Sequence, residues 1–105
     1  MESVRQSKVA KLLQKELAEI FRANAKSMFN DAFVTVTVVR FSADLSSAKI
    51  YISIMASQDV NATFNMINDQ KQHIRKILGN LIGKQVRVVP EISFFIDDSY
   101  DYAEK

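Results

Sequence analysis

The chain lacks several residue types on which common functional sites depend. It has no cysteine, which excludes disulfide bonds and thiolate metal sites. Its one histidine, His73, cannot form a histidine cluster for a metal ion. Its two glycines are spaced Gly-x-x-x-Gly, which fits neither a P-loop nor a dinucleotide-binding fingerprint. We therefore expect no metal site and no cofactor.

The remaining catalytic candidates are weak. His73 lies on a predicted helix beside polar and basic residues, which is typical of a solvated helix position. Asp97 and Asp98 are adjacent at the end of a predicted strand, and neighbouring residues of an extended chain point to opposite faces, so their carboxylates do not converge on one substrate. The sequence predicts no enzymatic activity and no small-molecule substrate, and it disfavours the alternative of a small dimeric enzyme.

Long apolar runs are also missing. No run approaches the roughly 20 residues that span a bilayer. The first eight residues, Met-Glu-Ser-Val-Arg-Gln-Ser-Lys, contain no apolar segment of the kind found in signal peptides. We expect a cytoplasmic protein without membrane contact. An apolar content of 48% in 105 residues predicts one small domain spanning residues 1–105.

Hydrophobic periodicity predicts the order of the secondary-structure elements. Spacings of three and four residues indicate helices, and alternation of apolar and polar residues indicates strands. The predicted elements are a helix at 4–22 that ends before Asn30-Asp31, strands at 33–41 and 49–55, a helix from the caps at 58–61 to about 82, and a strand at 86–96. A short connection makes the first two strands antiparallel. We expect an α+β fold with helices on one face of a three-stranded mixed sheet.

Two features near the end of the chain qualify this prediction. Pro90 cannot donate a hydrogen bond to a ladder, so it should lie at an edge, at a bulge or at the start of the last strand. The acidic residues from about 98 to 105 are expected to form a mobile tail.

Basic residues gather in two segments although the net charge is only +2. They follow one stripe of the first helix and flank both glycines. Exposed cations there would bind nucleic-acid phosphates and release counterions. The candidate RNA-binding residues are Arg5, Lys8, Lys11, Lys15, Arg75, Lys76, Asn80, Lys84 and Arg87. The alternative is that these residues only keep the surface solvated.

Gly79 and Gly83 both fall near the end of the second predicted helix. In one interpretation, Gly83 caps the helix in a left-handed conformation and Gly79 is a tolerated interior glycine. In the other, the helix bends near Gly79-Asn80. The order α-β-β-α-(kink)-α-β is the plan of a type II KH domain, an RNA-binding module. The spacing Gly-x-x-x-Gly differs from the GXXG loop of such domains.

Three segments of the chain carry recognisable motifs. These are the basic opening at 5–18, the stretch Val-Val-Arg-Phe-Ser-Ala-Asp-Leu-Ser-Ser-Ala-Lys-Ile-Tyr-Ile-Ser at 38–53, and Val-Arg-Val-Val-Pro-Glu-Ile-Ser-Phe-Phe-Ile-Asp-Asp-Ser at 86–99. Together they resemble the ribosome-binding factor A family, because they occur in that family's order and their match spans nearly the whole chain.

The resemblance implies a type II KH-like fold and a monomeric, cytoplasmic, non-enzymatic protein. It implies ribosome biogenesis as the role. The partners it implies are the free small (30S) ribosomal subunit and its 16S rRNA, which the protein binds during late maturation. Processing of the 5′ end of that RNA and growth in the cold are further implications.

One segment departs from the family. The family marks its interhelix kink with Ala-x-Gly, soon followed by Ile-Arg. When the chains are aligned on Ile74-Arg75, the Ala-x-Gly positions are occupied here by Gln70, Lys71 and Gln72. The sequence thus leaves the kink either at Gly79-Asn80 or near Gln70–Gln72.

A second functional hypothesis needs no RNA contact. In it the domain is a protein-interaction module, and a partner protein binds the open sheet face. Tyr51, Ser53 and Phe95 would then matter more than the lysines.

Overall fold

The described part of the chain, residues 4–28, 32–55, 57, 59–86 and 88–97 of a computed structural model, follows the predicted order of elements. The elements are α1 (Val4–Met28), β1 (Phe33–Phe41), β2 (Ser47–Met55), α2 (Val60–Asp69), α3 (Lys71–Ile82) and β3 (Glu91–Ile96). The α+β class is confirmed. The predicted tail at 98–105 lies outside the described residues.

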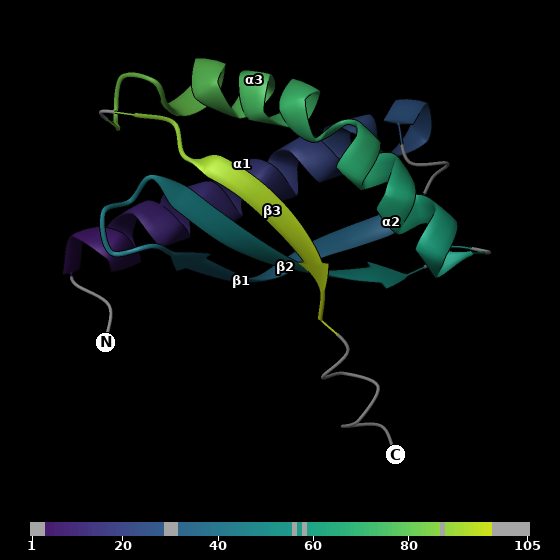
Figure 1. Ribbon diagram of the computed structural model, residues 1–105. Coiled ribbons are helices and arrows are strands. Elements are labelled where there is room, and N and C mark those ends of the chain that lie inside the picture. Colours follow the sequence, from purple (N-terminus) through teal and green to yellow (C-terminus); the bar gives the residue numbers. More distant parts are fainter. Residues whose placement is uncertain (1–3, 29–31, 56, 58, 87, 98–105) are drawn as a thin grey trace.

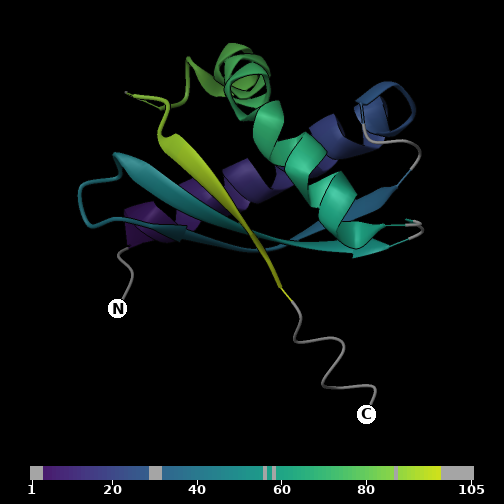
Figure 2. The same cartoon turned by 45° about the vertical axis from the view of Figure 1, so that its right-hand side comes forward.

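The sheet is mixed and has the order β1-β2-β3. β1 pairs antiparallel with β2 and β2 pairs parallel with β3. Alternate residues such as Val36, Ile50 and Phe94 are buried, and their neighbours along each strand are more exposed. Figures 1 and 2 show all three helices on one side of this sheet, so the described elements leave its other face open.

Each helix buries one apolar stripe against the sheet or against another helix. Leu13 and Leu17 of α1 are fully buried in the same core cluster as Ile50 and Ile52 of β2. The Phe21 ring of α1 meets the Phe94 ring of β3 edge to face, with centroids 5.9 Å apart. Such an arrangement contributes roughly 0.5–1.5 kcal/mol beyond the area buried. This core fixes α1 over the sheet and leaves its opposite stripe in solvent.

α1 is long, with 25 residues, but it is amphipathic rather than apolar. Lysines recur along its exposed face. Among the described residues, no helix is both long and apolar enough to cross a membrane.

The second helical segment breaks at Gln70. The structure ends α2 at Asp69 and starts α3 at Lys71. Gln70 adopts φ −101° and ψ 12°, a conformation open to residues other than glycine. α3 then runs unbroken through Gly79, so the predicted bend at Gly79-Asn80 is wrong and the position near Gln70–Gln72 is confirmed. The break lets α2 cover β2 and β3 while α3 packs against α1 and β3.

The last strand starts later than the sequence predicts. β3 begins at Glu91, whose amide donates to the Ser46 carbonyl at 2.9 Å. Pro90 has no amide hydrogen and is buried immediately before the strand. The Val89 and Pro90 carbonyls accept hydrogen bonds from Arg75, so this stretch faces α3 instead of joining a ladder. The expected placement of Pro90 at the start of the strand is confirmed.

Candidate nucleic-acid interface

The outer face of α1 carries an exposed basic stripe. Lys8, Lys11 and Lys15 are exposed, opposite the buried Leu13 and Leu17. A spacing of three and four residues places these lysines on one side of the helix. None of them forms an ion pair with a described carboxylate. Each therefore presents an ammonium group to solvent. Arg5 lies in the first turn, and its side chain is outside the described part.

The second group of candidates lies on and after α3. Lys76 and Asn80 are exposed on the helix, and Lys84 is exposed just beyond its end. These positions lie opposite the buried Ile74 and Leu78. Lys76 and Lys84 also lack an ion pair with a described carboxylate. Arg87 lies outside the described residues.

The fold brings the two groups onto the same side of the molecule. α1 and α3 pack against one another and cover the same face of the sheet (Figures 1 and 2). The start of α1 and the end of α3 lie toward the same end of the domain in Figure 1. We call the exposed side chains of Lys8, Lys11, Lys15, Lys76, Asn80 and Lys84 the helical face.

Arg75 has a different role from its neighbours. Its Nε donates to the Pro90 carbonyl at 3.0 Å and its Nη2 to the Val89 carbonyl at 2.7 Å. The Glu91 carboxylate lies 3.7 Å away. A guanidinium that donates hydrogen bonds to two backbone carbonyls holds both carbonyls in fixed positions, because its donors are rigidly arranged. Arg75 therefore anchors the connection between α3 and β3, and we leave it out of the helical face.

The two glycines allow that connection to pass close to α3. A Cβ at Gly79 would lie 3.3 Å from Val89 Cγ2. A Cβ at Gly83 would lie 2.7 Å from the Gly79 carbonyl oxygen, to which the Gly83 amide donates at 2.8 Å. Gly83 does cap α3, but with φ −57° and ψ −25°, so the left-handed conformation that one of the two interpretations gave it is wrong. Both glycines provide space rather than unusual dihedral angles.

The turn between β1 and β2 is held by side chains. Asp44 accepts hydrogen bonds from the hydroxyls of Ser46 at 2.7 Å and Ser42 at 2.8 Å, and from the Ser46 amide at 3.1 Å. These bonds, that from the Ser46 hydroxyl first, lower the pKa of Asp44 to about 2. Leu45 has φ 63°, the left-handed region that a leucine rarely adopts. Gln6 of α1 donates to the Ser42 carbonyl at 3.1 Å, which ties the turn to the first helix.

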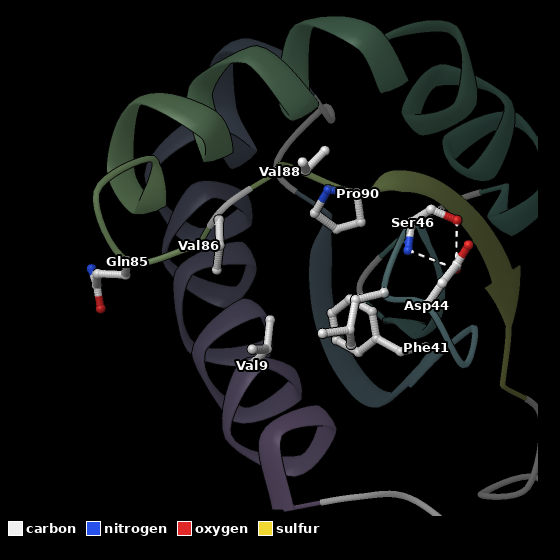
Figure 3. A pocket seen from close by; sticks show the side chains of 9 residues that line it. Val9, Phe41, Asp44, Ser46, Gln85, Val86, Val88 and Pro90 are labelled. Atoms are coloured by element: carbon white, nitrogen blue, oxygen red, sulfur yellow. Dashed lines mark hydrogen bonds between the residues drawn. The ribbon is translucent and has the colours of Figure 1, made fainter.

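These parts surround a hollow of about 260 Å³ (Figure 3). Its walls come from three distant stretches of the chain: Val9 of α1, the end of β1 with the following turn, and the connection before β3. The lining residues are Val9, Phe41, Asp44, Leu45, Ser46, Gln85, Val86, Val88 and Pro90. Each stretch includes residues from one of the three segments that resemble the ribosome-binding factor A family.

Comparison with known proteins identifies the family. A family model described as "Ribosome-binding factor A" matches residues 5–105. A protein of that name from Cytophaga hutchinsonii is 52% identical over 103 residues, which make up 98% of this chain and 77% of that protein. The chain belongs to the ribosome-binding factor A family.

Solved structures of this family share the fold. The crystal structure of ribosome-binding factor A from Thermus thermophilus superposes with a TM-score of 0.71 at 20% identity, covering 87% of this chain and 94% of that one. A homology model of the Thermus thermophilus protein, fitted into the cryo-EM map of its complex with 30S, gives a TM-score of 0.66 at 20% identity, covering 85% and 91%. The KH-like plan is consistent with these likenesses.

Family membership confirms the resemblance seen in the sequence, but sequence reasoning missed two features of this ribosome-binding factor A family member. One is the hollow, because the sequence predicts a strand at Val86 and Val88. The other is a pair of cations, Arg40 and Lys49, on the open face of the sheet. Strand alternation was a usable signal for the second, since both residues neighbour buried positions.

Proposed function

We propose that this chain binds the free small ribosomal subunit through phosphates of its 16S rRNA and assists the late maturation of that subunit. The observation that carries the proposal is the set of exposed lysines on the helical face, which have no ion pair with a described carboxylate and lie on or just after two helices that cover one side of the sheet. Family membership supports a ribosomal partner. The Thermus thermophilus relative has been fitted into a map of a 30S complex.

The helical face suits contact with an RNA backbone. Its cations are point charges on long side chains, which neutralise phosphates without reading bases. Each neutralised phosphate releases counterions, so affinity should fall as salt rises. Arg5 and Arg87 belong to the proposed site on the strength of the sequence alone. The protein acts in this proposal as a monomer in the cytoplasm and does no chemistry itself.

Co-sedimentation with purified small subunits, large subunits and intact ribosomes tests the proposal. We expect selective binding to free small subunits that weakens between low and moderate salt. The double substitution Lys76→Glu with Lys84→Glu should reduce that binding by about tenfold or more, because two attractive contacts become repulsive. The control is Arg22→Glu with Lys26→Glu, which makes the same change in charge near the other end of α1, where Arg22 is ion-paired with Glu19.

Two outcomes would contradict the proposed contact. Equal loss of binding in both double variants would mean that net charge matters and the helical face does not. Selective binding that resists salt would keep the ribosomal role and assign the contact to protein or to shape. Binding to none of the three particles would overturn the ribosomal role as well.

The role in maturation needs a separate readout in cells. We expect a strain without this protein to accumulate small-subunit RNA with unprocessed 5′ ends and to grow poorly in the cold. The wild-type chain should restore both, and the Lys76→Glu with Lys84→Glu variant should restore neither. Primer extension across the 5′ end measures the first effect. Normal 5′ ends in the deletion strain would exclude the processing role.

A further inference from the structure

The open face of the sheet carries a stacked pair of aromatic rings, of which Phe95 is exposed and Tyr51 is half-buried. Tyr51 of β2 and Phe95 of β3 are direct neighbours in the parallel register. Their ring centroids are 5.5 Å apart and the ring planes differ by 29°. Phe95 is 40% exposed although it is a large apolar side chain. None of the described helices covers this pair, because all of them pack on the other face (Figures 1 and 2).

Two cations lie side by side next to these rings. Arg40 of β1 is the antiparallel partner of Lys49 in β2, and both are exposed. Like charges directly opposite one another destabilise a sheet. Neither cation forms an ion pair with a described carboxylate. The Lys49 ammonium lies 6.0 Å from the centroid of the Phe95 ring.

The carboxylates of the same face have other partners. Asp97 accepts a hydrogen bond from the Thr37 hydroxyl at 2.6 Å. Glu91 lies 3.7 Å from the Arg75 guanidinium. An anion from outside the described chain is therefore what would relieve the repulsion between Arg40 and Lys49.

We propose that the open sheet face binds single-stranded RNA, with a base stacked on the Tyr51–Phe95 pair and a neighbouring phosphate held by Arg40 and Lys49. Aromatic rings beside cations are the combination that binds single strands, because every base has a face that can stack. Protein-docking surfaces are depleted of lysine, although aromatic residues, methionine and arginine are enriched there. Here Lys49 adjoins the rings, and the exposed apolar residues Phe33 and Met55 pair at the far end of the β1–β2 ladder. The two adjacent cations beside the rings favour RNA over a protein partner.

This surface is distinct from the helical face and lies on the opposite side of the sheet. The proposal therefore goes beyond the contact described under the proposed function and does not require it. With both faces in use, the domain would lie between two RNA segments, one held by its backbone and the other by a base.

A titration followed by nuclear magnetic resonance tests the proposal on the intact chain. The probe is an oligouridine of about eight nucleotides, within the length that a single-strand site occupies, added to protein uniformly enriched in the nitrogen isotope that the experiment detects. We expect the largest amide shifts in β2 and β3, around Tyr51 and Phe95. Shifts confined to α1 and α3 would overturn the proposal and would leave the helical face as the RNA contact.

Substitution of the ring supplies the affinity measurement. Phe95→Thr keeps a residue suited to a strand and should weaken oligouridine binding about tenfold, as expected when one base loses its stacking partner. The control is Phe33→Thr, which removes another exposed aromatic ring at the far end of the β1–β2 ladder. Fluorescence anisotropy measures both. Equal affinity for Phe95→Thr and wild type would overturn the proposal, and should Phe95→Thr fail to fold, the titration of the wild type decides.

Arg40→Gln combined with Lys49→Gln tests the charge. The slope of log affinity against log salt should become shallower by about 0.7 for each phosphate that is no longer neutralised. An unchanged slope would exclude these cations from the site. Loss of small-subunit binding in the Phe95→Thr variant, with oligouridine binding unchanged, would overturn the proposal and assign the face to a protein partner. The oligonucleotide readouts fail or succeed independently of the Lys76→Glu with Lys84→Glu experiment.

Discussion

Two connections face each other across the hollow, and they are held in opposite ways. The turn at residues 42–47 relies on side chains: Asp44 collects three hydrogen bonds, and a leucine takes the left-handed conformation. The connection between α3 and β3 relies instead on the missing side chains of two glycines, which have ordinary dihedral angles, and on the hydrogen bonds that Arg75 donates to the Val89 and Pro90 carbonyls.

The difference shows what limits the backbone in each place. A left-handed leucine costs about 1–2 kcal/mol, and it persists because the bonds around Asp44 and Ser42 determine the turn. At the other connection the dihedral angles are easy, but a methyl group would collide with neighbouring atoms. In this chain glycine marks close approach, and the unusual backbone conformation lies at Leu45.

Loss of the Arg75 hydrogen bonds should have the largest effect on the free energy of unfolding. Arg75→Ala removes two hydrogen bonds from a charged donor, which should lower the free energy of unfolding by about 2 kcal/mol. Urea denaturation followed by circular dichroism measures this. Arg75→Lys should recover less than half, because an ammonium cannot reproduce the two-pronged geometry.

The matched control for Arg75→Ala is Lys76→Ala. Lys76 is next in sequence but exposed and without an ion pair to a described carboxylate, so its truncation should change stability by less than about 0.5 kcal/mol. Similar losses for both variants would mean that the connection at 83–90 does not depend on Arg75.

Gly83→Ala should have the next largest effect. The added methyl group would lie 2.7 Å from the Gly79 carbonyl oxygen, so the last turn of α3 must shift. Such overpacking costs roughly 1–2 kcal/mol. The same denaturation experiment measures it, with Lys84→Ala as the exposed control. A gain in stability from Gly83→Ala would show that the turn relaxes freely, and the contrast with the Asp44 turn would lose its basis.

Much of the fold was predictable because it follows from periodic burial. Residues 33–41 alternate in the sequence and form β1, and the Asp59 side chain caps α2 through the Ala62 amide as expected. The break at Gln70 was harder to predict, since no glycine or proline marks it and its conformation suits many residues. The position of the break follows from tertiary packing, in which α2 and α3 cover different parts of the core.

The candidate site was predictable only in part. Helical spacing placed Lys8, Lys11 and Lys15 on one exposed stripe, as the structure shows. The same spacing could not show that Arg75 donates to the Val89 and Pro90 carbonyls, because that contact depends on how the chain returns after α3. A charged residue at a given helical position can be predicted to be exposed, but its hydrogen-bond partners cannot be predicted from that position.

The turn at Asp44 should respond to pH. Hydrogen bonds lower its pKa from 3.8 to about 2, so the folded state favours the ionised carboxylate. The stabilisation is complete above the unfolded pKa and is lost as the pH falls from about 4 toward 2. Asp44→Asn should therefore be less stable than wild type near neutral pH, and the difference should shrink as the pH falls to about 3 and below. A difference that stays constant with pH would mean that the charge of Asp44 does not hold the turn.

Gly79→Ala should give the smallest effect, because two contributions oppose each other. Alanine in a helix interior is favoured over glycine by roughly 0.5–1 kcal/mol. The new methyl group would lie 3.3 Å from Val89 Cγ2, which requires the valine to give way. We expect a net change within about 0.5 kcal/mol in urea denaturation.

The pair Gly79→Ala with Val89→Ala separates the two contributions to that balance. Once the valine methyl groups are gone, Gly79→Ala should stabilise the Val89→Ala variant by roughly 0.5–1 kcal/mol. No gain in that background would mean that the close approach involves more than Val89. A full gain in the wild-type background would mean that Gly79 is not needed for space, and only Gly83 would then support the contrast between the two connections.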